Sequence, residues 1–229
     1  DTVGKVVERE NLRIDTLRSE DAWNQLRATQ LDLTSGENGF AQKRGKDAVT
    51  QPLLKTYGQR YDDATNQIAA GLTTPRQKEL FRQRSEVSGM QFRDELMRHV
   101  LKEDSVYQDQ TFIGANAVEN QLAAQNWNQP AAIALSRERI DGLINARAAA
   151  AGWPEEYKLA ERNKYLGNLH ETVIDQALAN KEFVYAEKWF DEHKGDMDSA
   201  TIDKLAPRVE AGKQKELTNI YTTEFLAVC

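Results

Sequence analysis

Apolar residues recur at helical spacing through nearly the whole chain, and the clearest stretch is residues 152–205. In its first half the apolar positions lie three or four residues apart, on one helix face: Leu166, Leu169, Val173, Ile174, Ala177 and Leu178. Asn180 and Lys181 interrupt this pattern, and a second apolar face runs from Phe183 to Phe190. Because so short a helix is stabilised mainly by packing on a neighbour, the segment predicts a helical hairpin followed by the start of a third helix.

The first third of the chain predicts helix, glycine-rich loop and helix. Residues 3–33 form a long helical pattern with four apolar residues near one seam, Val3, Val7, Ile14 and Leu17, followed by Trp23, Leu26 and Leu33. Glu10 and Asp21 fall where a coiled coil needs apolar side chains, so we expect this helix to pack on its own domain. Residues 34–46 contain three glycines and predict a loop. Helix resumes over residues 49–70, with Pro52 in its first turn and Gly71 as a left-handed cap.

Thr74–Pro75 is the strongest helix-start signal, since a hydroxyl cap precedes proline at the first helical position. A long helix, or two abutting ones, is predicted over residues 75–126, with Gly89 and Gly114 as its weak points. Its candidate buried residues are Leu80, Phe81, Met90, Phe92, Leu96, Val100, Leu101, Tyr107, Phe112, Ile113, Val118 and Leu122.

Capping residues and prolines also predict where the remaining helices begin and end. Further helices are predicted over residues 130–151, from Pro154 onward and after Asp198–Ser199, with Pro207 kinking or splitting the last. The tail from Glu216 to Val228 is amphipathic through Leu217, Ile220, Tyr221 and Phe225. No stretch shows the alternation of a β-strand.

We therefore predict an all-α fold, a multi-helix array of αα hairpins that is solenoid-like or an irregular helical bundle, with no β-sheet. Two domains are predicted: residues 1–73, with the long helix, the glycine-rich loop and the second helix, and residues 74–229, with the helical hairpins. Leu122–Ala123 through Trp127 to Ile133 resembles Leu178–Ala179 through Phe183 to Trp189. This similarity suggests two related hairpins that stack on each other, with Ala177 and Ala186 at a close helix crossing.

Composition narrows the functional classes. A net charge of -6, with 30 basic and 36 acidic residues interspersed, offers no broad basic surface and disfavours nucleic-acid binding by this segment. The single cysteine, Cys229, excludes an intrachain disulfide framework. No apolar run is long enough for a transmembrane helix, and no secretory signal opens the chain. Because the chain begins at Asp1 and ends in an apolar run, we expect it to be part of a longer protein.

Two local patterns invite a chemical interpretation. Gly45–Lys46 resembles part of a phosphate-binding loop, but the spacing from Gly39 is one residue too long and Asp47 replaces the required Ser or Thr. We interpret this loop as a solvated connector with a basic cluster at Lys43, Arg44 and Lys46. Glu95, His99 and Glu103 share a helix face and could present ligands to a metal. The neighbouring Arg98 and Lys102 favour instead a solvated, salt-bridged face.

No catalytic motif is present, so no catalytic, cofactor-binding or metal-binding residue is predicted. His170 lies beside the apolar stripe and is expected to be packed and hydrogen-bonded inside the hairpin. His193 is expected to act as a cation at the end of a helix. Trp127, Trp153 and Trp189 are expected in the core.

Several spaced motifs resemble those of large virion proteins of tailed bacteriophages. They are Asn38–Gly39–Phe40 through Gly45 and Ala48, Ile68–Leu72, Gln77 and Phe81, then Asn126–Trp127, Gly152–Trp153–Pro154, His170, Val173–Ile174, Ala186 and His193–Lys194. The chain is similar, over residues 30–210, to the helical segment of internal virion or ejection-type proteins. Some of these proteins carry a peptidoglycan-cleaving domain elsewhere, and nothing in this sequence matches that lytic site.

The resemblance implies a non-enzymatic structural module that assembles through helix faces, by self-association or on other virion proteins, with no cofactor and no small-molecule substrate. It implies a location in the virion and delivery into the host cell envelope. Two alternatives stay open: a cellular α-solenoid adaptor that binds a protein or peptide, and a non-catalytic part of a cell-wall hydrolase.

Overall fold

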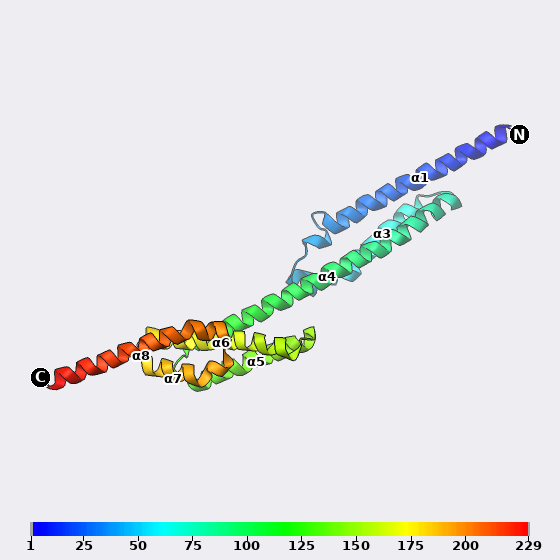
Figure 1. The fold of residues 1–229 in the computed structure, drawn as a ribbon. Helices are drawn as coiled ribbons and strands as arrows, with labels where there is room; N and C mark the ends of the chain where they lie inside the picture. Colours follow the sequence, from blue (N-terminus) through cyan, green and yellow to red (C-terminus); the bar gives the residue numbers. More distant parts are fainter. Residues whose placement is uncertain (1, 229) are drawn as a thin grey trace. The chain divides into compact units, whose positions relative to one another are not determined.

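A computed structural model describes the backbone of residues 2–228 and the side chains of residues 3–218 (Figure 1). Over these residues the chain forms eight α-helices and two short 3-10 helices, with no β-strand. The prediction of an all-α, multi-helix fold is confirmed. The described part does not include Cys229 or the side chains of Ile220, Tyr221 and Phe225. The prediction that the tail from Glu216 to Val228 is amphipathic therefore rests mostly on side chains outside the described part.

The chain divides into two compact units, residues 1–110 (unit 1) and residues 111–229 (unit 2). The division lies inside a long helix, whereas the sequence places it between residues 73 and 74. The physical reason is that the helices on both sides of residue 73 share one core, in which Tyr61 and Phe92 stack at 4.8 Å between ring centroids.

Unit 1 contains four helical elements and the first part of a fifth: α1 (Thr2–Ser35), η1 (Phe40–Gln42), α2 (Lys46–Thr50), α3 (Leu53–Ala70) and the beginning of α4 (Pro75–Gln125). Their buried apolar residues form one cluster: Ala22, Leu26, Phe40, Ala48, Leu53, Tyr57, Tyr61, Leu72, Phe81, Phe92 and Leu96. Gly89 permits close packing of α3 on α4, because a Cβ there would lie 3.2 Å from the Tyr61 ring. The helix therefore continues through the predicted weak point.

The turn between α3 and α4 anchors α1. Thr74 Oγ1 accepts a hydrogen bond from the Gln77 N–H at 3.1 Å, which confirms the predicted hydroxyl cap. Asp15 accepts two hydrogen bonds from this turn, from Thr74 Oγ1 at 2.9 Å and from Gln77 Nε2 at 2.8 Å. Residues before Asp15 extend past the turn, as the start of α1 does in Figure 1.

The apolar seam of α1 faces away from its own domain, contrary to expectation. Val3, Val7, Ile14 and Leu17 are between 43% and 77% exposed, whereas Ala22 and Leu26 on another face are buried. At 100° per residue the seam lies about 130° around the helix from the buried face. The prediction that α1 packs on its own domain is confirmed for its second half, which contacts α3 through Leu26, with Trp23 and Leu33 packed against the same core. The first half begins about three turns before the α3–α4 turn, so the other helices of unit 1 do not cover it.

The long helix α4 carries apolar residues on two faces. Four residues predicted to be buried are at least 55% exposed: Met90, Leu101, Ile113 and Val118. In unit 1 an outward stripe on α4 comprises Val87, Met90, Met97 and Leu101, roughly opposite the buried Phe92 and Leu96. Apolar type alone does not reveal which of two stripes a neighbouring helix covers.

Unit 2 contains the end of α4, then α5 (Pro130–Ala151), α6 (Glu155–Ala179), α7 (Phe183–His193), η2 (Lys194–Asp196) and α8 (Ser199–Val228). Helix α6 packs against α5, α7 and α8. The buried apolar core is Phe112, Ala123, Ile133, Ile140, Ile144, Leu166, Leu169, Val173, Ile174, Ala177, Ala186, Trp189, Met197, Leu205 and Val209. The predicted hairpin of residues 152–205 therefore exists, and Ala177 and Ala186 are fully buried in it.

Three local predictions need correction. Gln51 is extended and Pro52 precedes α3, so the helix breaks there, because proline disfavours helical geometry in the residue before it. Gly71 is right-handed, since its N–H closes a tight turn on Ile68 O at 3.1 Å. Helix α8 continues through Pro207 without splitting. The left-handed cap occurs instead at Gly152, after α5.

The two hairpins predicted to be related share a side-chain hydrogen bond at the end of their first helix. Asn126 Nδ2 donates to Leu122 O at 2.9 Å after α4, and Asn180 Nδ2 donates to Gln176 O at 2.8 Å after α6. Burial differs between the two copies, since Ala123 is buried and Ala179 is exposed.

Candidate functional site

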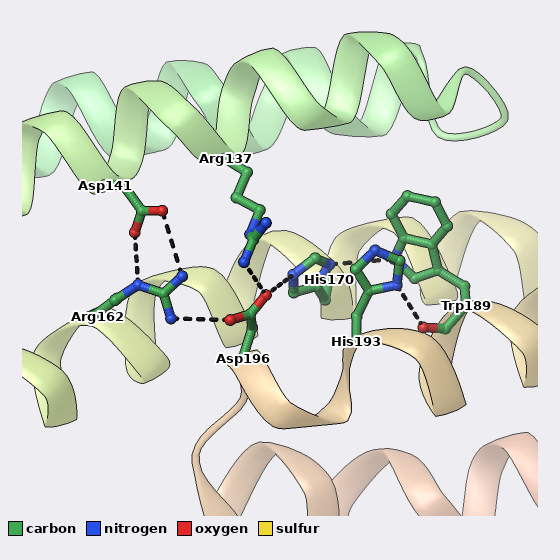
Figure 2. A network of polar contacts seen from close by, with 7 residues as sticks. All are labelled: Arg137, Asp141, Arg162, His170, Trp189, His193 and Asp196. Carbon is green, nitrogen blue, oxygen red and sulfur yellow. Dashed lines mark hydrogen bonds and ion pairs between the residues drawn. The ribbon is translucent and has the colours of Figure 1, made fainter.

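A network of polar contacts in unit 2 joins α5, α6, α7 and η2 (Figure 2). Its members are Arg137, Asp141, Arg162, His170, Trp189, His193 and Asp196. Each side chain comes from a helix that also supplies apolar core residues, so packing of the core brings the polar groups together.

Asp196 is the centre of the cluster. Its Oδ2 receives Arg137 Nη2 at 2.7 Å, and its Oδ1 receives Arg162 Nη1 at 2.9 Å. Arg162 also pairs with Asp141, with 2.8 Å between Nε and Oδ1. The two arginines therefore connect the single turn of η2 to α5 and α6.

His170 is fully buried beside this carboxylate. Trp189 Nε1 donates to His170 Nδ1 at 3.2 Å, so in the neutral ring the proton lies on Nε2. His170 Nε2 is 3.9 Å from Asp196 Oδ2, too far for a hydrogen bond, and has no hydrogen-bond partner. The expectation of a packed, hydrogen-bonded histidine is confirmed.

His193 stacks on Trp189, with 4.1 Å between ring centroids, and its Nδ1 donates to Trp189 O at 2.9 Å. Its ring is also 4.6 Å from the ring of His170. His193 thus belongs to the packed aromatic group, which its position in the last turn of α7 does not reveal.

Burial and neighbouring charges set the protonation states. Burial, followed by the charge of His193, lowers the pKa of His170 to about 3, so the ring is neutral at neutral pH. Burial by itself would raise the pKa of Asp196, but the hydrogen bond from Arg162 and the charge of Arg137 outweigh it and hold that pKa below its usual value. The cluster therefore contains a neutral imidazole and an ionised carboxylate.

This geometry orders helices and offers little to a substrate. A histidine beside a carboxylate is a common catalytic pair, but His170 has no exposed surface and no nucleophile is hydrogen-bonded to it. Paired arginines and carboxylates at this depth fix the position of η2 against α5 and α6. The cluster is best described as a partly buried polar lock between helices, with His170 and Trp189 as its buried members.

The residues predicted as possible metal ligands hold a loop instead. Glu103 is buried, and its Oε2 accepts a hydrogen bond from the Gly45 N–H at 2.7 Å. His99 Nε2 donates to Lys43 O at 2.8 Å, while Glu95 stays exposed. The interpretation of a solvated face was wrong for His99 and Glu103, because the glycine-rich loop folds back on α4. Among residues 3–218, no group of three or more His, Cys, Asp or Glu side chains is arranged to hold a metal.

The same loop is anchored by aromatic side chains. Phe40 is buried, and its ring lies 5.8 Å from Tyr57, 5.8 Å from Phe92 and 5.4 Å from His99. Tyr57 Oη donates to Asn38 O at 2.5 Å. The loop predicted as a solvated connector is therefore an ordered part of the core of unit 1.

One groove of unit 2 is formed by the start of α5 and by α7. It has a volume of about 400 Å³ and is lined by Pro130, Tyr185, Lys188, Trp189, Glu192 and His193. Its wall is aromatic, with Tyr185 and Trp189 stacked at 5.7 Å between centroids. Of the three tryptophans predicted in the core, Trp189 is buried, whereas Trp127 and Trp153 are only partly buried against it.

Sequence reasoning found the two histidines but missed Arg137, Asp141, Arg162 and Asp196. These residues belong to three separate elements and have no motif spacing, so no local signal in a highly charged chain distinguishes them.

In the described part of the chain, no helix combines the length and apolarity needed to cross a bilayer. No protein family, curated protein or solved structure matches this chain.

Proposed function

We propose that this chain is a non-enzymatic assembly module of a tailed-bacteriophage virion protein, of the internal or ejection type, that acts through contacts between helix faces. The observation that carries the proposal is apolar surface at coiled-coil spacing on α1, where Val3, Val7, Ile14 and Leu17 are exposed. The outward stripe on α4 adds a second surface of this kind. Contiguous exposed apolar faces of this type are characteristic of protein–protein contacts.

The virion context rests on the resemblance of the spaced motifs. The structural features agree with it: helices with mostly local contacts refold readily, as delivery through a narrow channel requires. The polar lock of unit 2, with its buried histidine, orders helices and presents no reacting group at the surface.

The test is the protein content of particles. Mass spectrometry of density-purified virions should detect peptides of this chain at a fixed copy number, and cryo-microscopy of those virions should place helical density of this size inside the particle. Absence of these peptides from purified virions would contradict the proposal.

The aromatic groove of unit 2 favours a second candidate, a cellular adaptor that binds a protein or peptide. A pulldown from host lysate should then return one dominant partner. That partner should be lost when Tyr185→Lys fills the groove with charge, and retained when Lys181→Glu changes a surface charge outside it.

A further inference from the structure

The imidazole of His170, on α6, has one ring nitrogen toward α7 and the other toward η2 (Figure 2). Its Nδ1 accepts a hydrogen bond from Trp189 Nε1 at 3.2 Å. Its Nε2 is 3.9 Å from Asp196 Oδ2 and has no hydrogen-bond partner. The ring is fully buried. The contact with α7 therefore requires a neutral ring, because only a neutral imidazole has a nitrogen that accepts a hydrogen bond.

A proton on His170 reverses these two relations. Both ring nitrogens of an imidazolium are donors, so Nδ1–H and the Nε1–H of Trp189 would face each other without an acceptor. The positive ring is at the same time attracted to the carboxylate of Asp196. A shift of about 1 Å brings Nε2 and Oδ2 within hydrogen-bond distance. Protonation thus exchanges a partner on α7 for a partner on η2.

Charged and titratable groups lie near His170 on each element that packs against α6. They are Arg137 on α5, Arg162 on α6 itself, His193 on α7, Asp196 on η2 and Lys204 on α8, which pairs with Glu171. Burial opposes a proton on His170 most strongly, followed by the charge of His193, and only Asp196 favours it. The pKa of His170 is therefore lowered to about 3, and the packed arrangement of α7 excludes the proton.

The contacts that hold α7 and η2 differ in their response to acid. Arg137 and Arg162 hold η2 through Asp196, whose pKa lies below its usual value, so these pairs persist in mild acid. The second half of α7 is held by the buried Trp189 and by His193, which stacks on it at 4.1 Å. Because α7 has only 11 residues, its helix depends on such packing. Loss of the Trp189 contact therefore loosens α7 and leaves η2 in place.

We propose that His170 is a proton-sensitive switch: its protonation exchanges the contact with Trp189 for an ion pair with Asp196, and α7 opens from α6 while η2 stays anchored. Helix α7 supplies five of the six residues that line the aromatic groove, and Pro130 of α5 is the sixth. Opening therefore removes the groove, so acid controls whether it can hold a ligand. This inference is independent of the virion role proposed above.

The direction and size of the effect follow from proton linkage. In the open form the ring of His170 is in water and has a pKa of about 6.5, whereas the closed form holds that pKa at about 3. Below pH 6.5 the open form binds a proton that the closed form excludes, so opening becomes more favourable as the pH falls. The equilibrium constant for opening should rise about 25-fold between pH 7 and pH 5.

Hydrogen exchange of the full chain, followed by mass spectrometry between pH 7 and pH 5, tests the switch. Protection is expressed relative to an unstructured peptide at the same pH, which removes the intrinsic pH dependence of exchange. Amides of residues 186–193 should be less protected than those of residues 140–148 in α5 by about tenfold or more. Their protection should fall about 25-fold over this range. Equal protection of the two helices at every pH would mean that α7 opens only with the whole unit, and would overturn the proposal.

Two variants test whether His170 causes this pH dependence. His170→Asn keeps an acceptor near the position of Nδ1 and does not titrate, so the protection of α7 should no longer depend on pH. His99→Asn removes a histidine of unit 1 and should leave the dependence unchanged. A pH dependence that persists in His170→Asn, or disappears in His99→Asn, overturns the proposal.

A measurement on the unmodified chain does not rely on the folding of a variant. The ring nitrogen chemical shifts of His170, measured by NMR, should remain those of the neutral ring with its proton on Nε2 between pH 7 and pH 5. A ring that titrates near pH 6.5 in the folded chain would show that closed α7 admits the proton. That result would overturn the proposal whatever the virion content of the chain.

Discussion

Proteins usually keep apolar side chains inside and charged side chains at the surface, and the two units depart from this arrangement in different ways. In unit 2 the partly buried pair of Asp196 and Arg162 and the buried, neutral His170 lie against core residues. Unit 1 exposes apolar surface, along the apolar seam of α1 and the outward stripe on α4. The comparison teaches that polar groups inside unit 2 fix helix positions within it, whereas apolar groups outside unit 1 are available for a contact beyond it.

The largest expected effect lies in the core of unit 1. Phe40→Ala removes a buried ring that holds the glycine-rich loop against Tyr57, Phe92 and His99, and should destabilise unit 1 by about 4 kcal/mol. Urea unfolding followed through Trp23, the only tryptophan of unit 1, measures it. If the loop were a solvated connector, the change would be below about 0.5 kcal/mol.

A smaller loss is expected from the polar lock of unit 2. Asp196→Ala leaves Arg137 and Arg162 without their shared carboxylate, and should lower the free energy of unfolding of unit 2 by about 2 kcal/mol, because the groups are partly exposed and Arg162 keeps Asp141. Asp191→Ala is the matched control, because Asp191 pairs only at the surface with Lys194. Equal losses from the two variants would show that the lock is not structural.

Acid should weaken unit 2 through His170. Its pKa is about 3 in the folded chain and about 6.5 when unfolded, so below pH 6.5 the unfolded chain binds a proton that the folded chain does not. Stability is therefore full above pH 6.5 and falls as the pH drops toward 3, by about 2 kcal/mol between pH 7 and pH 5. Denaturant unfolding across this range measures it, and His170→Phe should flatten the dependence even if it lowers stability at pH 7.

A modest effect is expected where α4 holds the loop. Glu103→Ala leaves the Gly45 N–H without its acceptor, and should destabilise unit 1 by about 1.5 kcal/mol. Glu95→Ala, two turns earlier on the same helix and exposed, should change stability by less than about 0.5 kcal/mol. Amide hydrogen exchange of residues 43–46 should accelerate in the first variant only.

The smallest effect should come from the apolar seam of α1 itself. Ile14→Lys should change the free energy of unfolding by less than about 0.5 kcal/mol, because the side chain is already in water in the isolated chain. Urea unfolding of the full chain measures this change. A large loss of stability would mean that the seam packs within unit 1, and would remove the contrast between the units.

Much of the fold follows from local signals. The cap at Thr74, the start of α5 at Pro130 and the hairpin from Leu166 to Trp189 are each determined by residues within a few positions. The candidate sites follow far less well. His99 and Glu103 bind a loop more than 50 residues earlier in the chain, and Asp196 meets Arg137 and Arg162 only after three elements pack. The sequence does not identify such pairs, because the chain contains many charged residues and only a few of them pair between elements that are distant in sequence.

The sequence by itself determined that this chain is helical, where most helices begin and end, and that α1 carries a seam at coiled-coil spacing. Only the tertiary structure decided that this seam faces outward and which of the two apolar stripes on α4 is exposed. It also decided that four charged residues connect η2, α5 and α6 in unit 2. The reason is physical: helix formation depends on neighbours a few residues away, whereas burial depends on which faces the other helices happen to cover.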